Sequence, residues 1–245
     1  MLRYYMEYQL RRQVTNGLLT LMKIYSTIIK EINVDESRNR LRIMPALPTA
    51  AQPGQYYRAF APGIAQVLPV PLYPLLVETD SMVLCGNIPA WQVGTILLLE
   101  GPNGKGFSTS LSARRLLIHA IDKPLEERLI PLANEALQTG ADVAWVSEAL
   151  ALELPPQIEV LKVTEFIDAL QWSDGCALAV PLARIPNIPD ELAIIPADQA
   201  KVEVLIDAPF VCGNAQCGVC AVETRNGLKL ACKDGPVLPY WELFQ

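Results

Sequence analysis

Four cysteines close to the C-terminal end constrain this chain more than any other feature of its sequence. They have the spacing C-x4-C-x2-C-x11-C and make up four of the six cysteines among 245 residues. Thiols gathered this densely in a protein without a secretion signal are typical of metal binding or redox chemistry, and less typical of disulfides. The sequence therefore predicts a metal centre in this segment. The predicted ligands are Cys212, Cys217, Cys220 and Cys232.

The spacing also indicates the kind of metal centre. Intervals of four and two residues are those by which plant-type ferredoxins bind a [2Fe–2S] cluster through four thiolates. With the usual pairing, Cys212 and Cys217 hold one iron, and Cys220 and Cys232 hold the other. A glycine follows each of the first two cysteines, which lets backbone N–H groups approach the sulfur atoms and influence the reduction potential.

Two other interpretations of the cysteines stay open. Structural zinc also uses four thiolates, but it prefers two well-separated C-x2–4-C pairs, and only Cys217 and Cys220 form such a pair here. Unligated thiols are the second alternative, although thiols this dense rarely go unused. The two remaining cysteines, Cys85 and Cys176, lie in apolar strand contexts, and we predict that they are ordinary core residues.

Composition excludes several classes of function. The chain has 26 acidic and 20 basic residues, a net charge of −6, and no cluster of Lys and Arg of the kind that reads phosphate. We therefore expect no nucleic-acid partner. No run of 18 apolar residues is present, so no membrane span is expected. The first residues do not have the pattern of a secretory signal, and we expect a cytoplasmic protein.

The hydrophobic pattern divides the chain into a β region followed by an α/β region. Short strands separated by turn signals, such as RLRIM, MVLC and TILLLEG, favour a small barrel or sandwich. Strands such as RLLIHAI and CALAVP then alternate with helical segments, which is typical of a parallel sheet. The predicted domains are an N-terminal extension (1–21), a β barrel (22–110), an α/β domain (111–200) and a cluster-binding domain (201–245).

The C-terminal segment resembles one family. CGNAQCGVC followed by CKDGPVL is similar to the end of the electron-transfer subunit of heterodimeric dihydroorotate dehydrogenase, a ferredoxin-reductase-like protein with a C-terminal [2Fe–2S] domain. Residues 233–237 (KDGPV) fit the closing motif, and Ala215 replaces a glycine of the family. Further upstream, PGQY (53–56) and GPNGKGF (101–107) look like segments of the family's flavin barrel.

This resemblance implies a fold and a set of cofactors. The implied fold is a flavin-type β barrel, then a nucleotide-type parallel α/β domain, then a small [2Fe–2S] domain. In the family, electrons pass between NAD(H), FAD, the cluster and the FMN of a separate catalytic subunit. The implied partner is therefore an oxidoreductase subunit such as dihydroorotate dehydrogenase of pyrimidine biosynthesis, in a hetero-oligomer.

The nucleotide motifs of the family are degraded in this chain. The barrel segment VLPVPLYP (67–74) has no arginine where the family holds flavin phosphate. The first α/β strand runs into Asp122-Lys123-Pro124 without the glycines that let a pyrophosphate meet a helix. FAD stays open as a second cofactor, and NAD(H) has less support. His119, the single histidine, lies in an apolar strand and is expected to be a buried core residue.

The sequence predicts an iron–sulfur electron-transfer subunit, and it identifies no catalytic and no nucleotide-binding residue. We expect the cluster to relay single electrons to or from a partner oxidoreductase, so the chain is not expected to be a self-sufficient catalyst. The first alternative is an FAD-containing NAD(P)H:acceptor reductase subunit. The second is a structural or assembly protein whose C-terminal segment is held together by metal.

Overall fold

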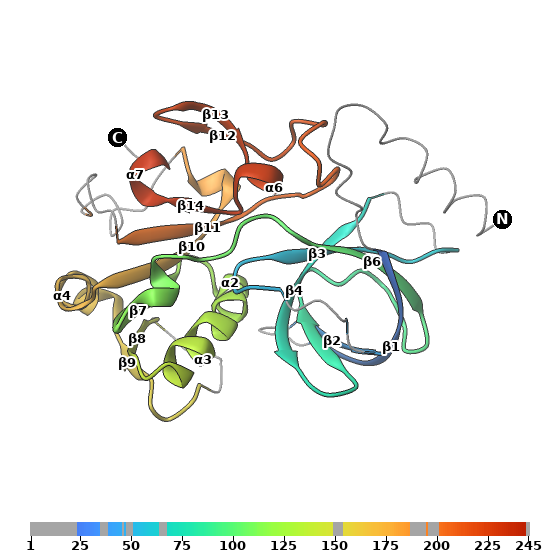
Figure 1. The fold of residues 1–245 in the computed structure, drawn as a ribbon, viewed down its shortest axis with the longest axis horizontal. Coiled ribbons are helices and arrows are strands. Elements are labelled where there is room, and N and C mark those ends of the chain that lie inside the picture. Colours follow the sequence, from blue (N-terminus) through green and yellow to red (C-terminus); the bar gives the residue numbers. More distant parts are fainter. Residues whose placement is uncertain are drawn as a thin grey trace.

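The computed structural model describes residues 24–34, 39–45, 47, 51–63, 68–148, 154–186, 195 and 201–243. The predicted N-terminal extension and most of the proline-rich stretch before residue 200 lie outside these ranges. The described chain forms a closed barrel beside a six-stranded sheet, and the C-terminal cysteine segment lies across both (Figure 1). No described helix is long and apolar enough to cross a membrane.

The β region is a closed antiparallel barrel with the strand order β1-β2-β5-β4-β3-β6. Tyr57 and Ala59 of β3 point into its core, together with apolar side chains from each of the five remaining strands. The predicted strands RLRIM, MVLC and TILLLEG are all present. Two further strands carry weak sequence signals, because β3 contains an arginine and β4 contains two prolines. The strands are β1 (Ile24–Val34), β2 (Asn39–Met44), β3 (Tyr56–Phe60), β4 (Val70–Val77), β5 (Met82–Cys85) and β6 (Ile96–Asn103).

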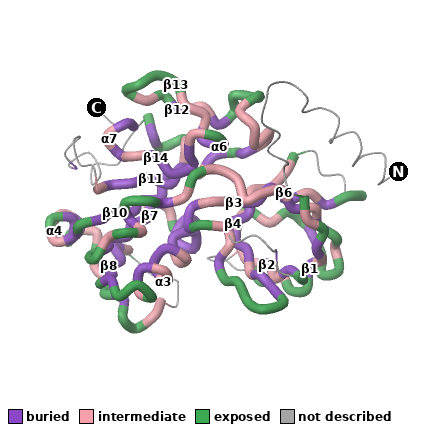
Figure 2. The backbone as a smooth tube through the Cα atoms, viewed as in Figure 1, coloured by how far each residue is buried: buried purple, intermediate pink, exposed green. Residues whose placement is uncertain are grey.

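The α/β region is a sheet with the order β14-β11-β10-β7-β8-β9, parallel except for β14. Its central strands are buried along nearly their whole length, as parallel strands covered on both faces require (Figure 2). Its elements are η1 (Ser110–Ser112), β7 (Arg115–Ala120), α2 (Lys123–Glu126), η2 (Glu127–Leu129), α3 (Ile130–Gln138), β8 (Asp142–Val146), β9 (Glu159–Leu161), η3 (Val163–Glu165), α4 (Phe166–Trp172), β10 (Gly175–Pro181), η4 (Leu182–Arg184), β11 (Val202–Asp207) and β14 (Val237–Pro239).

The cysteine segment is built into this sheet. After β11 the chain forms the cysteine loop, a hairpin of β12 (Ala221–Thr224) and β13 (Gly227–Leu230), and the helix α6 (Ala231–Asp234). It then returns to the sheet as β14 and ends in α7 (Tyr240–Leu243). The predicted boundary at residue 200 therefore falls just before a strand of the six-stranded sheet. Buried side chains of the cysteine segment share one core with that sheet.

Candidate metal centre

The four predicted ligands lie on one loop and one short helix. Cys212, Cys217 and Cys220 follow β11 in the loop that leads to β12, and Cys232 lies on α6. Cys220 and Cys232 are buried, Cys212 is half-buried and Cys217 is exposed. The site thus has a buried end against the protein core and an exposed end facing solvent.

The structure brings the four thiols together as two pairs. The thiol of Cys212 forms a hydrogen bond with that of Cys217, and the thiol of Cys232 forms one with that of Cys220. The negative charge of Cys212 also acts on Cys232, so the two pairs are neighbours. Among the described residues, no three His, Cys, Asp or Glu side chains are grouped as ligands of a single metal ion. The pairs are those that the sequence predicts for the two irons of a cluster, and the ligand assignment itself stays a prediction.

Backbone amides in the loop point at the sulfur atoms. The N–H of Gln216 donates to Sγ of Cys212 over 3.3 Å, and those of Asn214 and Cys217 donate to the same sulfur. Burial opposes ionisation of Cys212, but these donors outweigh it and lower the pKa of the thiol to about 6. The loop is therefore organised to stabilise negative charge on sulfur.

The buried pair has the opposite electrostatics. Burial, together with the hydrogen bond to the Cys220 thiol, raises the pKa of Cys232 to about 12, although the N–H of Ala215 donates to its sulfur. A thiolate here needs a positive partner, and a coordinated metal supplies one. Ala215 reaches Cys232 by adopting a left-handed backbone with φ of +64°, at the position where the resembling family has glycine.

A buried arginine of the barrel lies under the loop. Arg58, on β3, donates from Nη1 to both carboxylate oxygens of Glu100, at 2.9 and 3.0 Å. It donates from Nη2 to the carbonyl of Val211, next to Cys212, over 2.7 Å. The loop crosses so closely that a Cβ on Gly213 would lie 2.6 Å from Cδ of Arg58. Only glycine fits at this crossing, which ties the cysteine loop to the barrel.

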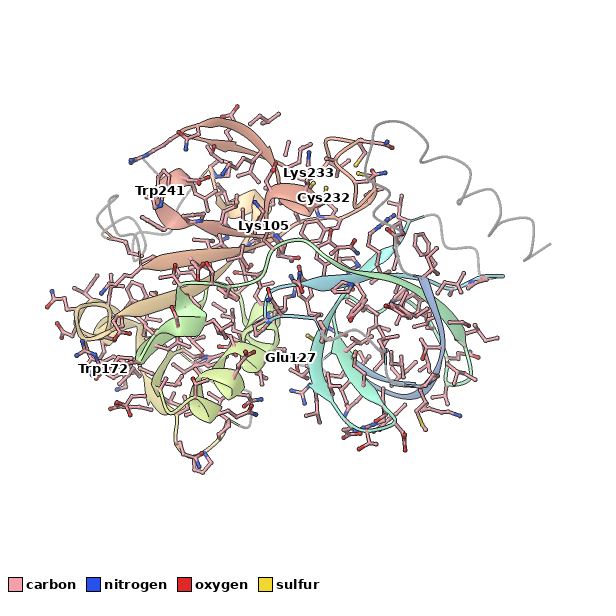
Figure 3. The ribbon with its side chains drawn as sticks, viewed as in Figure 1. Lys105, Glu127, Trp172, Cys232, Lys233 and Trp241 are labelled. Carbon is pink, nitrogen blue, oxygen red and sulfur yellow. The ribbon has the colours of Figure 1, made fainter. Side chains whose placement is uncertain are left out.

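The sequence motifs of the barrel meet the cysteine segment at a second junction. The N–H of Lys105 donates to the carbonyl of Gly235 over 2.5 Å, and Gly104 packs on Pro236 so closely that a Cβ would lie 2.4 Å from the proline ring. A Cβ on Gly54 would likewise lie 2.7 Å from Val237. Residues 101–103 of the GPNGKG segment belong to β6 and Gly104 forms a bend after it, and Figure 3 marks Lys105 and Cys232 at this junction. Barrel and cysteine segment therefore form one packed unit.

The comparisons with known proteins identify the segment that carries these cysteines. Residues 208–244 match the family model described as the iron–sulfur cluster binding domain of dihydroorotate dehydrogenase B. This segment is similar to an iron–sulfur cluster binding domain. All four predicted ligands lie within it, and the resemblance drawn from the sequence motifs is confirmed.

Other similarities extend over most of the chain. The gamma subunit of sulfhydrogenase 1 from Pyrococcus furiosus is 21% identical over 236 residues, which cover 78% of this chain and 80% of that subunit. A structure of NADH-dependent reduced ferredoxin-NADP oxidoreductase matches with a TM-score of 0.66 at 18% identity, over 94% of this chain and 91% of that one. Phthalate dioxygenase reductase matches with a TM-score of 0.53 at 10% identity, over 89% and 77% of the two chains.

These findings confirm the fold class as ferredoxin-reductase-like, and they support an electron-transfer subunit of an oxidoreductase. The residues present fit an iron–sulfur cluster, because the loop supplies three thiols, backbone amides aimed at sulfur and two left-handed glycines, and α6 supplies the fourth thiol. The prediction of an iron–sulfur cofactor is confirmed by the family match.

The residues of β4 fit a flavin phosphate less well than the cysteine segment fits a cluster. Strand β4 has no arginine, and its Tyr73 packs instead against the guanidinium of Arg128, which lies 4.5 Å from the ring centroid. Arg128 is itself paired with Asp207 over 2.5 Å. The buried cation nearest to β4 is therefore already neutralised by a carboxylate. The residues of β4 therefore supply no arginine for a flavin phosphate.

The edge of the sheet where a pyridine nucleotide would bind is acidic. Asp122 follows β7 and precedes α2, a helix of only four residues, and it lies 3.9 Å from Arg184. Glu126 is buried beside Ser147, whose hydroxyl donates to it over 2.7 Å. Burial raises the pKa of Glu126. No glycine separates β7 from α2, so the residues present do not fit a pyrophosphate.

The remaining predicted residues lie in the core. His119 is buried, with Nδ1 3.0 Å from the carbonyl of Val146, and Cys85 and Cys176 are buried in strands. Sequence reasoning missed Arg58 and Glu100. They are 42 residues apart in the chain, and only the pairing of β3 with β6 brings them together. An arginine within an otherwise apolar strand was the one signal available.

Proposed function

We propose that this chain is an electron-transfer subunit that holds one [2Fe–2S] cluster on Cys212, Cys217, Cys220 and Cys232 and relays single electrons for a partner oxidoreductase. The observation that carries the proposal is the arrangement of these thiols in two adjacent pairs, inside the segment that matches an iron–sulfur domain.

In this proposal the two ends of the cluster site have different roles. A [2Fe–2S] cluster, when bound, exchanges one electron at a time. The buried pair, Cys220 and Cys232, anchors the site to the protein core. At the other end Cys217 and Val219 are exposed, and this is the side from which a partner can approach closely. The amides around Cys212 stabilise the negative charge that the thiolates carry.

The partner supplies the remaining cofactors in this proposal. The β4 segment and the β7–α2 turn fit nucleotide phosphates poorly, so electrons reach the loop from a cofactor held by another subunit. A flavin-dependent dehydrogenase such as dihydroorotate dehydrogenase is one such partner, suggested by the family of the matched domain. A hydrogenase assembly is a second, suggested by the name of the Pyrococcus furiosus relative.

Anaerobically purified protein tests the proposal directly. We expect two irons and two acid-labile sulfides per chain, no zinc, no flavin, and a visible spectrum that dithionite bleaches reversibly. Cys217→Ser should lose the cluster, while Cys176→Ser should keep it, because Cys176 is buried in β10 away from the loop. Zinc in place of iron, or iron that stays redox-inactive, would favour the metal-stapled structural protein and contradict the relay.

A second function, an FAD-containing reductase, has one observation in its favour. Arg128 is buried, and its Nε has no hydrogen-bond partner within the described part of the chain. It lies beside a hollow between β4 and α3 that Tyr73 and Pro74 also line. If this arginine serves a flavin phosphate, purified protein will contain one FAD per chain, and Arg128→Met will lose the FAD but keep the iron. Protein that retains no FAD on gel filtration removes this alternative.

A further inference from the structure

Two side chains of the barrel strand β3 face the cysteine loop instead of the barrel. Residues alternate along a strand, so Tyr57 and Ala59 fill the barrel core while Tyr56 and Arg58 point to the opposite side. That opposite side is covered by the cysteine segment. Tyr56 stacks on Phe210 with ring centroids 4.2 Å apart, and Arg58 bonds the carbonyl of Val211.

Both side chains carry polar groups that have no partner within the described part of the chain. The Tyr56 side chain is fully buried, and its hydroxyl has no hydrogen-bond partner among the described residues. Arg58 is 8% exposed, and its Nε is likewise without a partner there. Buried donors in native proteins are nearly always satisfied. Tyr56 and Arg58 thus present two unsatisfied donors on one face of one strand, directly under the cysteine segment. They point to a negatively charged hydrogen-bond acceptor that the cysteine segment binds.

We propose that β3 supplies the polar floor of the cluster, and that the Arg58 guanidinium and the Tyr56 hydroxyl raise its reduction potential. The inference rests on the function proposed above. Reduction adds one negative charge to the cluster, and a permanent cation and an O–H donor in a buried setting stabilise that charge. Tyr56 also lies close enough to Cys232 and Cys220 for their negative charges to act on its hydroxyl.

Glu100 allows a test of the direction in which the reduction potential shifts. Its carboxylate, on β6, binds Nη1 of Arg58, while Nη2 of Arg58 binds the loop. Glu100 therefore offsets part of the positive charge that the loop experiences. Removing the charge of Arg58 should lower the potential, and removing the charge of Glu100 should raise it. A purely structural role of this ion pair would not produce opposite signs.

The experiment is a redox titration of the full chain, followed by visible absorbance and electron paramagnetic resonance. At the wild-type midpoint, Arg58→Gln should lower the ratio of reduced to oxidised cluster about tenfold, a shift of about 59 mV for one electron. Glu100→Gln should raise the ratio severalfold. The double variant should return close to the wild type. Tyr56→Phe keeps the ring and its stacking, and should lower the ratio by less than Arg58→Gln does.

Matched controls separate local from general effects. Arg42→Gln makes the same charge change on β2, where Arg42 pairs with Glu31 and Glu78, and should leave the potential unchanged. Tyr57→Phe removes a hydroxyl from the neighbouring residue that faces the barrel core, and should also leave it unchanged.

The outcomes distinguish this inference from the function on which it rests. A wild-type chain without iron and sulfide contradicts the proposed function. A wild-type chain with a reversible cluster whose potential moves in the same direction, or not at all, in Arg58→Gln and Glu100→Gln overturns only the role of β3. If Arg58→Gln fails to load iron, Glu100→Gln decides alone: an unchanged or lowered potential refutes the proposal.

Discussion

The cysteine loop and the β7–α2 turn occupy comparable places in this molecule and differ in every detail that binds a cofactor. Each follows a strand of the six-stranded sheet, the loop after β11 and the turn after β7. The loop has two left-handed glycines, amides aimed at sulfur and an arginine beneath it. The turn has no glycine, and Asp122 is its last residue before α2. The fold places both segments at strand ends, and the residues alone decide which of them holds a cofactor.

The largest effect should come from removing a predicted ligand at the buried end of the loop. Cys220→Ser takes away one of two anchoring thiolates, and we expect iron to fall from two atoms per chain to almost none. Cys176→Ser is a close control, because Cys176 is 0% exposed and Cys220 is 2% exposed. Iron analysis of both purified variants measures the difference. Equal iron in the two would mean that Cys220 is not a ligand.

A smaller effect should separate the two glycines of the loop. Gly213 and Gly218 have φ of +66° and +72°, so alanine at either position costs about 1–2 kcal/mol for the left-handed backbone. At Gly213 the new Cβ also meets Arg58, whereas at Gly218 no atom of the described residues lies within 4 Å of it. Overpacking should add about 1–3 kcal/mol at Gly213 alone.

Urea unfolding of Gly213→Ala and Gly218→Ala measures this difference. We expect the Gly213 variant to have the lower midpoint and to lose iron faster. If the two variants unfold at the same urea concentration, the contact between loop and barrel contributes nothing to stability. The arginine beneath the loop would then not be a feature that distinguishes the loop from the turn in stability.

Glu126, on α2 directly after this turn, should make the stability of the protein depend on pH. Burial raises the pKa of Glu126 in the folded protein, so the folded state binds this proton more tightly than the unfolded state does. The free energy of unfolding then falls as the pH rises from the unfolded pKa of Glu, about 4.3, through the raised folded value. Glu126→Gln should remove this fall while it keeps an acceptor for Ser147. Urea midpoints between pH 4 and 8 test it, and identical slopes in both proteins would contradict the expectation.

Sequence reasoning succeeded where short-range pattern determines structure. The spacing of Cys212 to Cys232 predicts an iron–sulfur loop without any knowledge of the fold, and alternation and apolar runs predict most strands of both regions. The strand β4 carries no such signal, because Pro71 and Pro74 interrupt its pattern, although β4 closes the barrel all the same. Tertiary pairing with β3 and β5 decides its structure.

The parts of the site that the sequence does not predict all depend on contacts between distant segments. Arg58 lies 153 residues from Val211, and its role is visible only once β3 is packed under the loop. The helical stretch between β7 and β8 is divided into α2, η2 and α3, because Pro131 has no N–H to continue the helical hydrogen bonds. The predicted domain boundary at residue 200 falls between β10 and β11, which pair in parallel, because hydrophobic pattern does not show which sheet a strand joins.

The smallest expected effect concerns Ala215, the residue that departs from the family pattern. Its φ of +64° costs a residue with a Cβ about 1 kcal/mol or more relative to glycine, and the extra freedom of glycine in the unfolded chain offsets part of this. Ala215→Gly should therefore raise the free energy of unfolding by about 0.5 kcal/mol. The N–H of Ala215 donates to the sulfur of Cys232 in this conformation, and glycine adopts it without strain. Iron content should stay the same while the urea midpoint rises slightly. A less stable variant would show that the methyl group of Ala215 packs against the core and stabilises the protein. The alanine would then be more favourable than the glycine of the family pattern.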